Sequence, residues 1–141
     1  MIAMRFVDTN VLIYAIGRGA SEAAKSHTAN SLLQERDLAI STQVLQEFCV
    51  QATRTTRRDP LSHVEAVSFI ETLCEFPVQE TTLDLVRAAL RTKERFKISY
   101  WDAAILEAAR ALGCDTVLSE DLNDGQNFDG VRVVNPFVEH S

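Results

Sequence analysis

The sequence predicts an α/β fold, a three-layer α/β/α sandwich built on a parallel sheet of about five strands. Short apolar runs alternate along the chain with segments of helical periodicity, and this alternation indicates parallel strands joined by helical crossovers. The length of 141 residues, with 46% apolar and 24% charged residues, is typical of one globular domain. Because no repeat, linker or low-complexity segment divides the chain, we expect a single domain over residues 1–141.

The first half of the chain is predicted to hold two strands and three helices. A β-compatible run at 4–7 is followed by Asp8-Thr9-Asn10, whose short polar side chains suit the start of a helix. Asp59-Pro60 is predicted to end the last of the three helices. The expected order is a strand at 4–7, helices from 9 to 16 and from 21 to 36, a strand at 38–40 and a helix from 42 to 58.

The second half repeats the pattern. Helices are expected at 62–74 and 82–96, with a short strand at 77–80 between them. Ser99 opens an alanine-rich helix that Gly113 ends. Strands are expected at 116–118 and 131–134, and the segment between them, rich in Asp, Asn and Gly, is expected to be a loop.

Charge and composition exclude several classes of protein. Fourteen Lys and Arg against twenty Asp and Glu give a net charge of −6, the wrong sign for binding nucleic acid by bulk charge. No stretch without Asp, Glu, Lys or Arg exceeds nine residues, so a membrane span is not expected. The N-terminus lacks the layout of a secretory signal, which predicts a cytoplasmic protein. Cys49, Cys74 and Cys114 are widely spaced and are expected to be small buried residues.

Polar residues at the predicted strand ends form a candidate site. Asp8 follows the first strand, and Asp121 comes soon after the strand at 116–118. Asp102 opens a helix, and Glu47 lies in the helix after the second strand. Ligands of parallel sheets bind beyond the carboxyl ends of the strands, so the four acids are expected to gather there. Their mutual repulsion calls for a cation, and oxygen ligands favour Mg²⁺ or Mn²⁺ over Zn²⁺.

Each of these acids also has a purely structural interpretation. Asp8 suits a helix N-cap, and Ser99 with Asp102 has the spacing of a capping box. Glu47 lies beside the apolar stripe of its helix, where a Glu is usually solvated. Asp121 lies in a loop whose acids suit turn formation. Residue types and spacing alone leave these alternatives open.

Three motifs resemble those of a known family. Phe6-Val-Asp-Thr-Asn-Val-Leu-Ile13 resembles the opening of PIN domains, Ser99-Tyr-Trp-Asp-Ala-Ala-Ile105 resembles their third-acid helix, and Val117-Leu-Ser-Glu-Asp121 resembles their fourth-acid turn. The resemblance implies a metal-dependent ribonuclease of the VapC type, the toxin of a toxin-antitoxin pair. It further implies strand order 3-2-1-4-5, a cognate antitoxin as partner and a homodimer.

The resemblance also assigns roles to individual residues. Asn10 and Ser119 match the polar positions that brace the acids, and Asp124 matches a fifth acid of less defined role. Phosphodiester hydrolysis needs an activated water and charge stabilisation at phosphorus, which carboxylate-held Mg²⁺ or Mn²⁺ supplies. We expect Glu47 to orient water or hold a second metal. The expected catalytic residues are Asp8, Glu47, Asp102 and Asp121, of which Asp8, Asp102 and Asp121 are the expected metal ligands.

An acidic protein that binds RNA needs local positive charge. Arg54, Arg57 and Arg58 at the end of one predicted helix are the expected RNA-binding residues, and a second basic cluster lies between Arg87 and Lys97. A solvated helix face is the alternative for each arginine. Trp101 beside Asp102 either stacks on a base or, as is commoner at a helix start, packs half-buried.

Other chemistries match the sequence poorly. His27, His63 and His140 are isolated from one another, and neither a zinc-binding HExxH nor a nucleophile-elbow GxSxG motif occurs. The alternative from another class is a non-catalytic binding module, for magnesium or for RNA, of similar α/β fold. A receiver-type module would need a second acid at the end of the first strand and a Lys after the last strand, and neither is present.

Overall fold

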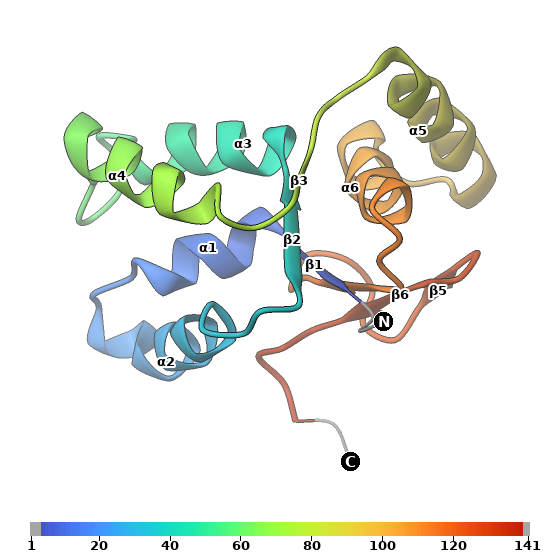
Figure 1. Cartoon of the computed structure of the whole chain (residues 1–141). Helices are drawn as coiled ribbons and strands as arrows, with labels where there is room; N and C mark the ends of the chain where they lie inside the picture. The colour runs from blue at the N-terminus through green and yellow to red at the C-terminus, as the bar shows by residue number, and fades with distance from the viewer. Residues whose placement is uncertain (1–3, 140–141) are drawn as a thin grey trace.

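A computed structural model describes residues 4–139 and has a six-stranded sheet in the order β3-β2-β1-β4-β6-β5. Helices α1 to α4 cover one side of this sheet, and α5 and α6 cover the other (Figure 1). The three-layer α/β/α prediction is confirmed. The strands are β1 (Arg5–Val7), β2 (Leu38–Ser41), β3 (Val78–Gln79), β4 (Thr116–Leu118), β5 (Asn127–Phe128) and β6 (Val131–Val134). The helices are α1 (Thr9–Ala15), α2 (Ala23–Leu32), α3 (Thr42–Ala52), α4 (His63–Leu73), α5 (Leu83–Phe96) and α6 (Tyr100–Ala111), with a short 3₁₀ turn, η1, at Ala20–Glu22.

The central strand β1 is parallel to both of its neighbours. Arg5 pairs with Leu38 of β2 and with Thr116 of β4, and Val7 pairs with Leu118. Among the five expected strands the order is 3-2-1-4-5, as the family resemblance implies. The β1 and β4 carboxyl ends therefore lie side by side.

Apolar strands buried on both faces make up the core. Phe6, Ile40 and Val117 are fully buried, as a strand covered by helices on both sides requires. On the other side, α6 is buried from Ala103 to Ala109, and its alanines let it approach the sheet closely. This packing fixes where the first turn of α6 lies relative to the strand ends.

The sheet contains one strand that the sequence analysis missed. β5 pairs antiparallel with β6, with Phe128 opposite Val131, inside the segment predicted to be a loop. Asp129 and Gly130, both with positive φ, form the turn between the two strands. The buried Phe128 packs edge-on against Phe96, so this short hairpin closes one end of the core.

Two helices end earlier than expected. α2 ends at Leu32 rather than near residue 36, and α3 ends at Ala52 rather than near residue 58. The Ala52 carbonyl, which a longer helix would use, instead accepts a hydrogen bond from the Leu61 N–H at 2.8 Å. The chain between these two residues forms a loop, which changes where the arginines at 54–58 lie.

The three cysteines differ from one another, which corrects the expectation that all are buried. Cys114 is buried, and burial raises the pKa of its thiol to about 11. Cys49 is half-buried, however, and Cys74 is exposed near the end of α4, because the apolar face of this helix does not include its position.

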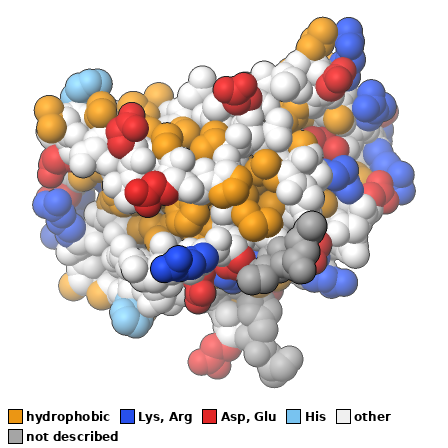
Figure 2. All heavy atoms as spheres, in the orientation of Figure 1, with side chains coloured by type: hydrophobic (Ala, Val, Ile, Leu, Met, Phe, Trp, Pro, Cys, Tyr) orange, Lys and Arg blue, Asp and Glu red, His pale blue; other side chains and the backbone are white. Residues whose placement is uncertain are grey.

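The surface has no broad basic face in the view of Figure 2, where apolar side chains gather centrally and charges of both signs are scattered around them. Two exposed apolar side chains, Val64 (76%) and Val67 (42%), lie on α4. Within residues 4–139, no helix is long and apolar enough to span a bilayer. A nucleic-acid partner would therefore have to be bound through a small local group of side chains rather than a broad basic face. His140 lies outside the described residues.

Candidate active site

Asp8 and Ser119 lie next to each other where β1 and β4 end. The Asp8 N–H donates to the Leu118 carbonyl at 3.0 Å, which continues the ladder by one residue. The Ser119 hydroxyl then donates to Asp8 Oδ2 at 2.7 Å, and Asp8 Oδ1 accepts from the Thr9 N–H at 2.8 Å. Both side chains are buried, so Asp8 is a helix cap and also an ordered carboxylate at the sheet edge.

Asn10, in the first turn of α1, connects the segments that carry the acids. Its Nδ2 donates to Ser119 Oγ at 3.1 Å and to Asp121 Oδ2 at 3.2 Å, with a longer contact of 3.4 Å to Asp8 Oδ2. Its Oδ1 accepts from the Glu120 N–H at 3.1 Å. The Asp121 N–H in turn donates to Ser119 Oγ at 3.1 Å. The loop after β4 is therefore held against α1 with the Asp121 carboxylate beside Asp8.

Glu47 approaches the same point from α3, whose N-terminus Ser41 caps through the Val44 N–H. Its Oε1 accepts from Gln43 Nε2 at 2.7 Å, and its Oε2 accepts from Thr9 Oγ1 at 3.1 Å. Both partners were missed in the sequence analysis. Gln43 lies one helical turn before Glu47, and this spacing was the only signal in the sequence that could have indicated their contact. Thr9 follows Asp8 in a different segment, so its contact with Glu47 had no such signal. Glu47 is thus half-buried and held in one orientation, which differs from the freely solvated side chain of its structural interpretation.

Asp102 reaches the site from the first turn of α6. Its N–H donates to Ser99 Oγ at 3.1 Å, so Ser99 caps this helix as the spacing suggested. The described capping contacts of α6 do not include a bond in which the Ser99 N–H donates to the Asp102 carboxylate, in contrast to the complete capping box at α4. The Asp102 carboxylate lines the cavity between α6 and α3.

The four acids, which come from four separate segments, line one small cavity of about 90 Å³. Burial raises the pKa of Asp8 to about 6, and the charges of Asp121 and Glu47 add to this effect against the opposing hydrogen bonds. Burial also raises the pKa of Asp102, again with the same two charges contributing. No Lys or Arg is among the described residues that line the cavity, which are Asp8, Thr9, Asn10, Gln43, Glu47, Gln51, Trp101, Asp102, Ile105 and Asp121.

The donor set of this cavity fits a hard divalent cation. Four carboxylates without a cationic side chain repel one another, and oxygen ligands are those that Mg²⁺ and Mn²⁺ prefer. Within residues 4–139, no three His, Cys, Asp or Glu side chains lie close enough together to form a metal site as they stand. The fit therefore rests on donor chemistry and charge, with Asp8, Asp102 and Asp121 as the side chains that would hold the ion.

The remaining predicted site residues lie apart from this cavity. Asp124 accepts a hydrogen bond from the Asn135 N–H at 2.8 Å and does not line the cavity. Arg54 lines a groove along α3, whereas Arg57 and Arg58 line a separate hollow of about 220 Å³ near η1. The structure does not bring the three arginines together, because α3 ends before all of them.

The sequence matches the PIN domain family over residues 5–128. The chain therefore belongs to this family, as its three motifs indicated. A search of curated protein sequences finds no significant match.

Several solved structures share the fold. FitAB bound to an IR36 DNA fragment is similar with a TM-score of 0.72 and 19% identity, covering 97% of this chain and 99% of that one. A toxin-antitoxin complex from Klebsiella pneumoniae has a TM-score of 0.67 and 21% identity over 94% and 97% of the two chains. VapC20 of Mycobacterium tuberculosis, a toxin that cleaves the sarcin-ricin loop, has a TM-score of 0.65 and 22% identity over 83% and 89%. At these identities the similarity concerns the fold.

Proposed function

We propose that this protein is a Mg²⁺- or Mn²⁺-dependent endoribonuclease and the toxin of a toxin-antitoxin pair. The observation that carries the proposal is the convergence of Asp8, Glu47, Asp102 and Asp121 on one cavity free of Lys and Arg among the described residues. Family membership and the fold shared with toxin-antitoxin structures support it. A cognate antitoxin and a homodimer are part of the proposal, since the family resemblance implies both.

In this proposal, Asp8 and Asp102 are the principal metal ligands, and Asp121 binds directly or through water. A bound divalent cation supplies positive charge at phosphorus and makes water a stronger nucleophile near neutral pH. The rest of the reaction depends on the protein's own side chains, which fix the acids and orient the water.

Asp8 and Glu47 contribute in different ways. The contacts of Asp8 with Ser119 and Thr9 hold its carboxylate in one orientation, so little rearrangement is needed when substrate binds. Each Glu47 oxygen accepts one hydrogen bond, from Gln43 or from Thr9, and a carboxylate oxygen has room for another. Glu47 therefore orients the attacking water and accepts its proton. The water oxygen bonds to phosphorus, the bond from phosphorus to the ester oxygen breaks, and the leaving oxygen takes up a proton from solvent.

A non-catalytic RNA- or magnesium-binding module of the same fold is the competing proposal. Cleavage of an end-labelled RNA by the purified protein distinguishes the two. We expect cleavage with Mg²⁺ or Mn²⁺ and its loss with EDTA. Binding of RNA without cleavage under every metal condition would favour the binding module.

A further inference from the structure

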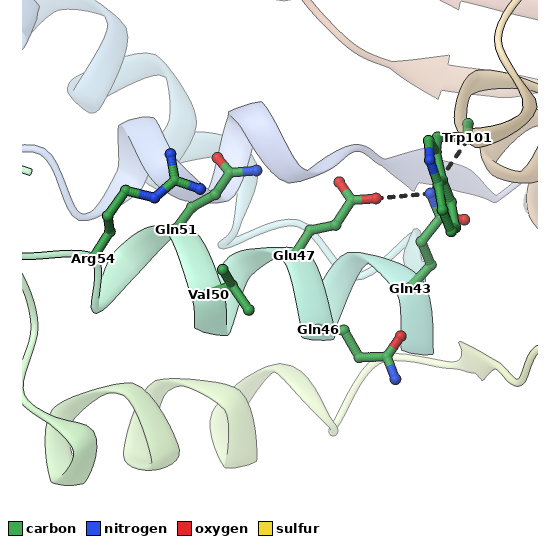
Figure 3. Close-up of a pocket in the computed structure, with 7 residues that line it drawn as sticks. All are labelled: Gln43, Gln46, Glu47, Val50, Gln51, Arg54 and Trp101. Atoms are coloured by element: carbon green, nitrogen blue, oxygen red, sulfur yellow. Dashed lines mark hydrogen bonds between the residues drawn. The ribbon is translucent and has the colours of Figure 1, made fainter. Parts of the chain in front are cut away.

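A groove of about 480 Å³ runs along α3 beside the acidic cavity (Figure 3). The two hollows adjoin, because Gln43, Glu47, Gln51 and Trp101 line both. The volume lies within the range of ligand-binding clefts, roughly 300 to 1,000 Å³. The groove is therefore large enough for a ligand that reaches the acids.

Trp101 closes one end of this groove, and the residue is 64% exposed. Its backbone is held in place, because Gln43 Nε2 donates to the Trp101 carbonyl at 3.3 Å. Its ring contacts Tyr100 edge-on, with centroids 5.1 Å apart. The half-buried packing expected for a tryptophan at a helix start is not observed. An exposed indole on a fixed backbone contributes little to the core, which leaves a flat apolar face available to a ligand.

The wall of the groove along α3 carries polar groups that are free to bind. The amides of Gln46 and Gln51 have no hydrogen-bond partner within residues 4–139. An amide offers a carbonyl acceptor and two N–H donors, which match the edges of nucleobases. Figure 3 shows Glu47 and Gln51 on the same side of α3, between Trp101 and Arg54.

Arg54 lies at the opposite end of the groove from Trp101 (Figure 3). It is exposed and makes no ion pair with any residue in the described part of the chain. A free guanidinium is well suited to a phosphate, which it binds through paired N–H donors. The groove thus has an aromatic face at one end, amides in between and a phosphate-binding group at the other end.

We propose that this groove binds a short unpaired stretch of an RNA strand next to the bond that is cleaved. A base stacks on Trp101, the amide of Gln51 on the same side of α3 as Glu47 contacts the strand, and Arg54 at the far end binds the phosphate of a neighbouring nucleotide. Stacking on a side chain requires a base that is not stacked in a duplex, so Trp101 selects an unpaired base beside the cleaved bond. This inference rests on the proposed ribonuclease function.

A second hollow of about 600 Å³ lies on the other side of Trp101 and is a less suitable site for RNA. It shares Gln43, Gln46 and Trp101 with the groove, and the rest of its described lining is Thr42, the acidic Glu80, Thr81, Tyr100 and Ala104. No Lys or Arg is among its described lining residues. A phosphate bound there would meet Glu80 rather than Arg54, so the side that faces α3 is favoured.

The inference can be tested by fluorescence, because Trp101 is the only tryptophan of the sequence. The full-length protein is titrated in EDTA, which prevents cleavage, with an oligo(A) RNA of about 12 nucleotides, within the usual size of single-strand sites. We expect saturable quenching. The same strand annealed to oligo(U) should quench much less at equal concentration.

Affinity measurements on variants identify the groups involved. Trp101→Ala should weaken binding roughly 5- to 150-fold, the cost of losing one stacked base, and Trp101→Phe should recover most of it. Arg54→Gln should reduce the slope of log affinity against log salt by about 0.7, the value of one phosphate contact on a single strand. Val64→Ala, which removes an exposed apolar side chain on α4, is the matched control and should leave affinity unchanged.

An affinity of Trp101→Ala within twofold of the original protein would overturn the nucleotide site. So would a shift from dimer to monomer caused by Trp101→Ala without RNA, because the groove would then be a contact between two copies of the chain. If either result is found while the original protein still cleaves RNA in a metal-dependent way, only the nucleotide site is contradicted and the ribonuclease function stands. RNA binding that depends on Trp101 without cleavage by the original protein under any metal condition would contradict the ribonuclease function and support the nucleotide site.

Discussion

The acidic side chains at the two ends of β1 have opposite surroundings: one is paired with an arginine, and the other lies among further acids. Where the strand begins, Arg5 donates to both oxygens of Asp37 at 2.7 and 2.8 Å, and this hydrogen-bonded pair lowers the pKa of Asp37. Where the strand ends three residues later, Asp8 is buried among other acids, and its pKa is raised to about 6. The same strand thus has a compensated charge at one end and an uncompensated one at the other. The comparison separates a stabilising ion pair at one end of the strand from the acids at the other end, which we propose bind a cation.

The largest expected effect is on turnover at the uncompensated end. Asp8→Asn and Asp102→Asn should each lower single-turnover RNA cleavage at least about 100-fold, because loss even of a partner that only orients a metal ligand costs 10- to 100-fold. RNA affinity without metal should be kept or raised, since a charge that repels phosphate is removed.

Ser99→Ala is the matched control for Asp102→Asn. It removes the helix cap at a cost of about 1 kcal/mol in stability while leaving the carboxylate in place. Cleavage should therefore persist in the folded variant. If Asp102→Asn unfolds the protein, the structural role of Asp102 dominates, and if Asp8→Asn cleaves normally, the assignment of the acids is wrong.

At the compensated end, we expect a loss of stability with no change in chemistry. Arg5→Gln should lower the free energy of unfolding by about 1 to 2 kcal/mol, as it leaves a partly buried Asp37 without its guanidinium. Since the pKa of Asp37 is lowered on folding, this contribution is present above pH 4 and is lost as the pH falls further. Denaturant unfolding at pH 7 and pH 3 measures both, and an unchanged turnover number in folded Arg5→Gln protein would support the separation of the two ends.

A smaller effect of opposite sign is expected from pH at Asp8. The folded protein holds this proton more tightly than the unfolded chain, because the pKa rises from 3.8 to about 6 on folding. Between pH 5 and pH 7, stability should therefore fall by roughly 1 kcal/mol through this group as pH rises. Comparing the original protein with Asp8→Asn in metal-free buffer isolates this contribution. Identical pH dependence of the two proteins would contradict the raised pKa.

Much of the fold and of the site was predictable from local sequence. The places of Asp8 and Ser119 after apolar strands and of Asp102 after a helix cap followed from neighbouring residues, whereas their assignment as site residues rested on the family resemblance. Repeated strand and helix signals also predicted the layers. These features depend on neighbouring residues along the chain, which the sequence displays directly.

The features that were missed depend on contacts between distant segments. β5 forms inside a segment rich in turn residues because Phe128 is buried against Phe96 of α5. The exposure of Trp101 depends on where the first turn of α6 lies relative to α3, to which the hydrogen bond from Gln43 Nε2 to the Trp101 carbonyl connects it, and residue spacing does not encode this. The side chains of Arg54 and Arg57 line different hollows, although the Arg57 N–H donates to the Arg54 carbonyl at 3.0 Å in the turn after α3.

A cation titration followed by thermal unfolding tests the central claim most directly. The account predicts that Mn²⁺ raises the Tm of the metal-free protein in a saturable way, with about 2.7 kcal/mol of stabilisation at 100 times the Kd. Asp8→Asn should start at an equal or higher Tm and respond much less to Mn²⁺. Arg5→Gln should start lower and respond as the original protein does. A Tm that does not change at millimolar Mn²⁺ or Mg²⁺ would contradict the claim that this end of the sheet binds a cation.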